Sequence, residues 1–234
     1  MAEITPEYET SMVQIPRSSS EGGKLSAYQV IPSGSGQLPG IIVIHEIFGL
    51  NENIRQIAER FAREGYAALA VDLFSGGNKV ICMLQIMYGM LIHPLKNSVM
   101  NDLESSLAYL RSIPEVDPGR TGVVGFCMGG TYALQLACVD DHLNAASVFY
   151  GQNPRPLEAV AQACPILGSY PEKDFTARAA RQLEPALEKY AVPHDIKIYP
   201  DARHSFFNDQ GGAFDPDASA DAWNRMLEFF EGYL

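Results

Sequence analysis

The chain has 234 residues, of which 47% are hydrophobic, enough apolar side chain for one large core. We therefore expect a single domain over residues 1–234 that begins with a polar lead over residues 1–24. The formal net charge of −11 argues against nucleic acid and anionic membranes as partners, because these polyanions bind clustered Lys and Arg.

The cysteines are widely spaced and form no Cys-x-x-Cys pair or Cys/His cluster, which favours free thiols in a reducing cytoplasm. They are Cys82, Cys127, Cys138 and Cys164. The first residues are acidic and lack the apolar run of a signal peptide, and the longest apolar run, 80–95, is too short to span a bilayer. We expect a cytoplasmic protein with no metal, cofactor or membrane partner, as a monomer or a homodimer.

Strand and helix patterns alternate along the chain. The run of β-branched residues over 40–45 is bounded by turns, which is typical of a strand buried on both faces in a parallel sheet. This alternation predicts the α/β class, a mostly parallel central sheet with helices on both faces. The expected strands are 25–31, 40–45, 67–71, 122–125, 145–150, 165–169 and 195–199. The first expected helix is 51–64, and the last, 218–233, presents a stripe of Trp223, Met226, Leu227 and Phe230.

The segment 75–96 interrupts this regularity with a lipophilic stretch that contains Met83, Met87, Tyr88 and Met90. Soft, adaptable side chains after a strand are suited to roofing a ligand pocket. A core helix or a dimer-contact helix explains the same composition, and both interpretations stay open.

The strongest local motif is GVVGFCMGGT over residues 122–131. An apolar strand runs into Gly-x-Cys-x-Gly-Gly and then into a helix, which is the nucleophile-elbow pattern with Cys in place of Ser. The glycines leave room for a strained turn, and the amino end of the helix favours negative charge on a thiolate or an oxyanion. The motif predicts Cys127 as a nucleophile, and the other cysteines, which lack this frame, as structural residues.

A nucleophilic thiol needs a base and a group that orients it. His204 follows the last expected strand, and Asp174 follows the strand over 165–169, so the chain order is nucleophile, acid, histidine. Glu172 remains a rival for the acid. The other histidines, which we expect to be structural or solvated, are His45, His93, His142 and His194.

The second local motif is HEIFG over residues 45–49, at the end of an early buried strand. In this arrangement the loop donates one backbone N–H to an oxyanion hole, and the residue after the nucleophile donates the other. The expected donors are Ile47 and Met128. Glu46 would then hold a negative charge near Cys127, which disfavours a thiolate and makes Glu46 a candidate switch for the thiol proton.

HEIFG, GFCMGG, Asp174 and the ARHSF segment around His204 together resemble the dienelactone hydrolase family, from about residue 40 to the carboxyl end. The resemblance implies an α/β-hydrolase fold and a cytoplasmic enzyme that opens an enol-lactone through a thiol ester. It also implies that the glutamate matching Glu46 takes the thiol proton when the substrate binds.

The chain departs from the family pattern where founding members use two arginines to hold the substrate carboxylate. Leu84 falls near the first position and Asn208 at the second. Arg203 and Lys79 are candidate substitutes, and the substrate is expected to be less anionic or more lipophilic than a dienelactone. The expected substrate-binding residues are Phe48, Tyr88, Phe175 and Arg203.

The leading hypothesis is a hydrolase that opens a lactone or small carboxylic ester through a thiol ester on Cys127. The first alternative is a non-catalytic scaffold of the same fold that binds a small hydrophobic ligand or a partner. The second is redox sensing by the Cys127 thiol.

Overall fold

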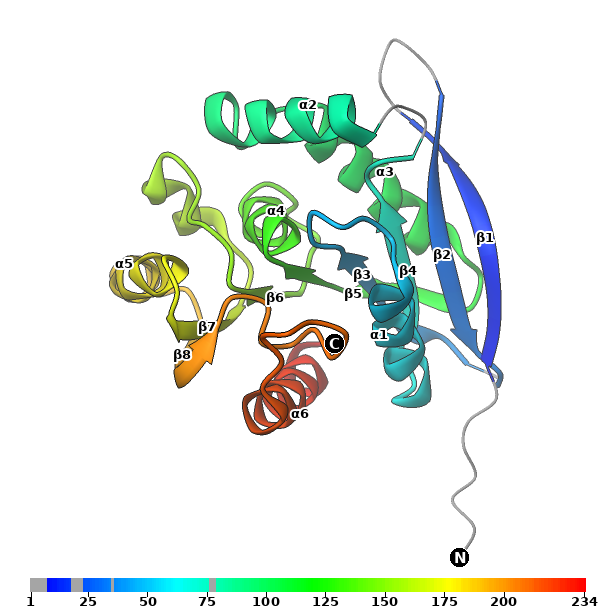
Figure 1. Cartoon of the computed structure of the whole chain (residues 1–234). Coiled ribbons are helices and arrows are strands. Elements are labelled where there is room, and N and C mark those ends of the chain that lie inside the picture. The colour runs from blue at the N-terminus through cyan, green and yellow to red at the C-terminus, as the bar shows by residue number, and fades with distance from the viewer. Residues whose placement is uncertain (1–7, 18–22, 35, 76–78) are drawn as a thin grey trace, which may run out of the picture.

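A computed structural model describes residues 8–17, 23–34, 36–75 and 79–234 (Figure 1). Within these residues an eight-stranded sheet has the order β1-β2-β4-β3-β5-β6-β7-β8. The pairs β1–β2 and β2–β4 are antiparallel, and every pair from β4–β3 to β7–β8 is parallel. The strands are β1 (Tyr8–Pro16), β2 (Lys24–Pro32), β3 (Leu38–Ile44), β4 (Ala67–Asp72), β5 (Val116–Phe126), β6 (Ala145–Phe149), β7 (Ile166–Lys173) and β8 (His194–Arg203).

Helices cover both faces of the sheet, as the alternating pattern predicted. Buried side chains of α1 and α6 pack with one face, and those of α3, α4 and α5 pack with the other (Figure 1). The helices are α1 (Glu52–Arg63), α2 (Lys79–Ile92), α3 (Ser98–Ser112), α4 (Met128–Ala137), α5 (Thr176–Lys189) and α6 (Pro216–Tyr233), and η1 (Leu157–Gln162) is a short 3-10 helix. The expected fold class, a mostly parallel sheet between helices, is confirmed.

Residues 8–16, which lie within the expected polar lead, form the edge strand β1, which the sequence analysis did not identify. Most of its side chains are exposed, so it has no apolar alternation that would mark it in the sequence. Its backbone pairs with β2 from Tyr8 opposite Pro32 to Pro16 opposite Lys24. An edge strand of this kind is stabilised by backbone hydrogen bonds to its neighbour more than by burial.

The Met-rich segment forms the helix α2, which lies beyond α3 and α4 on one side of the sheet (Figure 1). Ile86 is buried in the core, and its carbonyl accepts a hydrogen bond of 2.9 Å from the Tyr132 hydroxyl of α4. Leu84 and Tyr88 are exposed, so α2 contacts the core through only part of its surface. In the described part of the chain no helix is long and apolar enough to cross a membrane.

The carboxyl-terminal helix α6 docks through the stripe that the sequence predicted. The Asp215 side chain caps its first turn by accepting from the Ala218 N–H at 3.0 Å. Trp223, Met226 and Phe230 are buried, and Phe230 packs against Phe61 of α1 with ring centroids 6.1 Å apart. These contacts close one face of the sheet.

Replacing Phe230 by Ala should lower the free energy of unfolding by about 3–5 kcal/mol, because the side chain is fully buried. Urea unfolding followed by circular dichroism measures the loss. Tyr233→Ala is the control on the same helix, since Tyr233 is 41% exposed, and should cost less than about 1 kcal/mol. Equal losses in the two variants would contradict the docking of α6 through Phe230.

Candidate active site

Cys127 lies at a sharp turn between β5 and α4, with backbone angles φ 56° and ψ −113°. A Cβ atom on Gly125 would come within 2.0 Å of the Gly129 carbonyl oxygen. A Cβ atom on Gly129 would come within 2.3 Å of the Ile44 carbonyl oxygen at the end of β3. Only glycine permits these approaches, so the Gly-x-Cys-x-Gly-Gly motif encodes the turn that presents Cys127.

His204 and Asp174 form a hydrogen-bonded pair, with 2.7 Å between His204 Nδ1 and Asp174 Oδ2. The Asp174 carboxylate also accepts from the Phe175 N–H at 2.8 Å and from the Thr176 hydroxyl. With Nδ1 donating to Asp174, His204 keeps Nε2 as its basic nitrogen. The rival acid Glu172 is exposed, and among the described residues no hydrogen bond joins it to His204.

Tyr150, which the sequence analysis did not single out, is a buried neighbour of the other candidate groups. Its ring centroid lies 5.0 Å from that of His204. Its hydroxyl hydrogen-bonds Glu46, and its pKa is raised well above its usual value by burial and, less strongly, by the negative charge of Glu46. Tyr150 thus adjoins the candidate base, the carboxylate and the thiol. It directly follows β6, and position at a strand end is the only sequence signal that marks it.

Glu46 is a buried carboxylate with dedicated hydrogen-bond donors. Only 3% of the residue is exposed, and its oxygens accept from the Ser205 hydroxyl at 2.6 Å and from Asn208 Nδ2 at 3.1 Å. Both donors follow His204 in the chain, so one segment holds the base and the carboxylate. Asn208 stands where the family pattern has a substrate-binding arginine, and here its side chain hydrogen-bonds Glu46.

Burial and nearby carboxylates raise the pKa of the Cys127 thiol to about 12. Desolvation has the largest effect, the charge of Glu46 comes next, and Asp174 contributes less. The Met128 N–H hydrogen-bonds the sulfur and lowers the Cys127 pKa, but by less than burial and Glu46 raise it. The expected stabilisation of a thiolate by the amino end of α4 is therefore outweighed, and the resting sulfur is a thiol.

His45 fixes the loop that carries Glu46 and Ile47. Its Nδ1 lies 2.5 Å from the Glu46 carbonyl oxygen, and its Nε2 accepts from the Leu73 N–H at 3.0 Å. The side chain is fully buried, which agrees with the structural role expected for it. Gly49, at φ 83°, closes the loop by donating to the Glu46 carbonyl at 3.2 Å.

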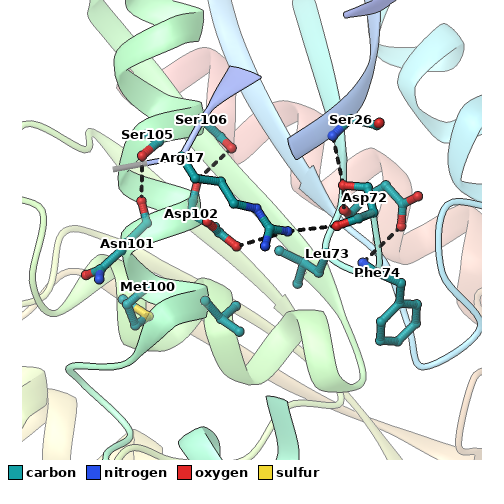
Figure 2. Close-up of polar contacts among 12 residues, drawn as sticks. Arg17, Ser26, Asp72, Leu73, Phe74, Met100, Asn101, Asp102, Ser105 and Ser106 are labelled. Atoms are coloured by element: carbon teal, nitrogen blue, oxygen red, sulfur yellow. Dashed lines mark hydrogen bonds and ion pairs between the residues drawn. The ribbon is translucent and has the colours of Figure 1, made fainter. Parts of the chain in front are cut away.

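The turn after β4, which supports His45, is itself anchored by Arg17, the residue after β1, and Arg17 links it to α3 (Figure 2). The Phe74 N–H donates to Asp72 Oδ1 at 3.1 Å, and Arg17 donates to the Ser75 carbonyl at 2.9 Å. Arg17 also lies 3.5 Å from the Asp102 carboxylate. Burial raises the pKa of Asp102, while the charge of Arg17 lowers it by a smaller amount.

The cysteines outside the elbow are free thiols without comparable neighbours. Cys138 is buried and its thiol donates to the Leu134 carbonyl, while Cys82 and Cys164 are partly buried. In the described part of the chain no three His, Cys, Asp or Glu side chains are grouped so as to hold a metal ion.

Comparison with known proteins decides the family. The sequence model of the dienelactone hydrolase family matches residues 25–234. The chain belongs to this family. It is a hydrolase with the α/β-hydrolase fold.

Individual members of the dienelactone hydrolase family match over nearly the whole chain. Two relatives carry the name "Putative carboxymethylenebutenolidase". The one from Synechocystis sp. is 32% identical over 99% of this chain and 100% of its own, and the one from Saccharolobus solfataricus is 35% identical over 90% and 95%. The crystal structure of a "Putative Dienelactone Hydrolase" from Klebsiella pneumoniae aligns with a TM-score of 0.83 and 29% identity, covering 97% of this chain and 100% of that one.

The expected substrate-binding residues of this dienelactone hydrolase family member lie in different surroundings. Phe48 is 59% exposed on the loop after Glu46, and the Phe175 ring stacks on His204 with centroids 5.5 Å apart. Arg203 is exposed and lines a separate hollow with Phe214. Among the described residues no hydrogen bond, ion pair or ring contact joins Tyr88 or Arg203 to the groups around Cys127. The side chain of Lys79 lies outside the described residues.

Alkylation of Cys127 by iodoacetamide should accelerate as the pH rises toward about 12, because only the thiolate reacts and the raised pKa keeps it scarce at neutral pH. Glu46→Gln removes a negative charge, lowers the Cys127 pKa and should speed alkylation at neutral pH by up to about tenfold per pKa unit lost. Peptide mass spectrometry follows Cys127 alone. Glu172→Gln is the control, and an unchanged rate in Glu46→Gln would contradict the assigned electrostatics.

Proposed function

We propose that the protein hydrolyses a lactone or a small carboxylic ester through a thiol ester on Cys127. In this proposal Cys127 is the nucleophile, His204 is the base and Asp174 orients His204. The main support is the hydrogen bond of 2.7 Å between His204 Nδ1 and Asp174 Oδ2. Tyr150 lies next to His204, and the glycine-framed turn presents Cys127. Family membership supports the class of reaction.

The first step is proton removal from Cys127. The thiol is protonated at rest, since its pKa is raised to about 12, so an acceptor must take the proton as the sulfur attacks. His204 Nε2 is that acceptor in our proposal, and Asp174 stabilises the imidazolium that forms. Glu46 keeps the thiol protonated until a substrate is bound. The family resemblance implies Glu46 as the alternative acceptor.

The sulfur then attacks the carbonyl carbon of the substrate. The tetrahedral oxyanion accepts hydrogen bonds from the N–H groups of Ile47 and Met128 in our proposal. In the described part of the chain the Ile47 N–H donates to no backbone oxygen, and the Met128 N–H hydrogen-bonds the Cys127 sulfur at rest. The carbon–oxygen bond to the alcohol breaks, and the imidazolium of His204 gives its proton to the departing oxygen. In a lactone this alcohol stays attached to the acyl chain.

Water resolves the thiol ester in the second half of the reaction. His204 takes a proton from the water as its oxygen attacks the acyl carbon, and the carbon–sulfur bond breaks. The proton returns to the sulfur, so the products are the acid and the free thiol. Phe48 and Phe175, both mostly exposed near these groups, are the side chains that we propose contact the substrate. Three expectations stay predictions. They are a substrate contact by Tyr88 or Arg203, a cytoplasmic location, and a monomeric or homodimeric state.

Cys127→Ala should lower kcat/KM for p-nitrophenyl acetate by at least about a thousandfold, because the variant has no atom to acylate. Rapid-quench mass spectrometry of the unaltered protein should find one acetyl group on the peptide that contains Cys127. Cys82→Ala is the control, since Cys82 is a partly buried thiol outside the elbow, and should keep full activity.

Unchanged turnover in Cys127→Ala would remove the proposed nucleophile. A protein that shows neither turnover nor an acyl-enzyme with any of a series of activated esters and lactones would instead favour the non-catalytic scaffold. A sulfenic acid or disulfide at Cys127 that forms while turnover is absent would favour redox sensing.

A further inference from the structure

The Ile47 N–H, proposed above as an oxyanion donor, belongs to a peptide group whose orientation is fixed through its carbonyl. That carbonyl, on Glu46, lies 2.5 Å from His45 Nδ1 and accepts from the Gly49 N–H at 3.2 Å. The peptide is trans, so its carbonyl and its N–H point in opposite directions. The Ile47 N–H is therefore directed away from His45 and Gly49, and the bond to His45 sets its direction.

The His45 ring is held in turn by the backbone of the turn after β4. Its Nε2 accepts from the Leu73 N–H at 3.0 Å, so the ring carries its proton on Nδ1 and donates it to the Glu46 carbonyl. The ring also packs against Phe74, with centroids 5.0 Å apart. The position of His45 thus follows the position of the turn.

The residues Asp72 to Ser75 form a β-turn that presents the Leu73 N–H. The Ser75 N–H donates to the Asp72 carbonyl at 3.0 Å, and the Phe74 N–H donates to Asp72 Oδ1 at 3.1 Å. Neither of these bonds uses the Leu73 N–H, which leaves it to bind His45.

Arg17 ties this turn to the body of the protein (Figure 2). Its Nη2 donates to the Ser75 carbonyl at 2.9 Å and lies 3.5 Å from Asp102 Oδ2 on α3. The Asp102 side chain is only 9% exposed, so water screens this ion pair less than it screens a surface pair. A second tie comes from the Ser26 N–H of β2, which donates to the Ser75 hydroxyl at 2.8 Å. Loss of Arg17 would therefore loosen the turn without releasing it.

We propose that Arg17 is a positioning residue for ester hydrolysis. Arg17 holds the turn over residues 72–75, the turn holds His45, and His45 directs the Ile47 N–H at the oxygen of the substrate carbonyl. Among the described residues no hydrogen bond or ion pair joins Arg17 to the proposed nucleophile or base, so its effect passes through the turn. This inference rests on the proposed function, because an oxyanion donor stabilises the transition state only within a narrow range of positions.

Arg17→Gln should lower kcat for p-nitrophenyl acetate about tenfold and leave KM within about twofold, because acylation and deacylation both pass through the oxyanion. Arg17→Lys should recover most of kcat, since its ammonium group beside Asp102 still donates to the Ser75 carbonyl. Arg111→Gln is the matched control. Arg111 is also partly buried and pairs with Asp140 at 3.0 Å, but it does not contact the turn, so kcat should stay within about twofold. Equal falls in kcat for the two Gln variants, or no fall in Arg17→Gln, would overturn the proposal.

Alkylation of Cys127 by iodoacetamide separates this role from a general disturbance of the site. The sulfur displaces iodide from a saturated carbon, and no oxyanion forms. The alkylation rate in Arg17→Gln should therefore stay within about twofold of the rate in the unaltered protein. A change in this rate as large as the fall in kcat would show that the substitution disturbs the thiol itself, and would refute the positioning role.

Amide hydrogen exchange followed by NMR tests the contacts without turnover. The N–H groups of Leu73 and Gly49 should exchange at least about fivefold faster in Arg17→Gln than in the unaltered protein or in Arg111→Gln. Unchanged exchange in Arg17→Gln would refute the positioning role even if Cys127 proves to be the nucleophile. Turnover that survives in Cys127→Ala would refute the nucleophile alone.

Discussion

The close approach of the backbone at Gly129 to the Ile44 carbonyl is the constraint on which the site depends. A Cβ atom there would lie 2.3 Å from that oxygen, so the start of α4 packs directly against the end of β3. The approach turns Cys127 outward at φ 56° and sets the loop with Glu46 next to the thiol. The backbone geometry at Gly129 thus determines which side chains come into contact around Cys127.

The electrostatics of the site follow from this juxtaposition. A buried carboxylate beside a half-buried thiol raises the cost of a thiolate, and the resting protein holds the less reactive form. Ser205 and Asn208, which hold Glu46, belong to the segment that carries His204. A shift of that segment would therefore act on the base and on the thiol's proton together.

Much of this architecture could be predicted from local sequence. Runs of β-branched residues identified the buried strands, and glycine spacing and chain order singled out Cys127, Asp174 and His204. The edge strand β1 could not be identified, because backbone pairing and not apolar alternation stabilises it. The place of Tyr150 beside His204 and the hydrogen bond of Asn208 to Glu46 depend on contacts between distant segments, and no local sequence signal gives these contacts.

The substitution Gly129→Ala tests the backbone constraint most directly, measured as the free energy of urea unfolding together with turnover of an activated ester. The added methyl group must displace backbone atoms of β3, so we predict a loss of at least about 3 kcal/mol and little or no turnover. Gly232→Ala near the end of α6 is the control, since a Cβ atom there meets nothing within 4 Å. Native stability and full turnover in Gly129→Ala would contradict the account.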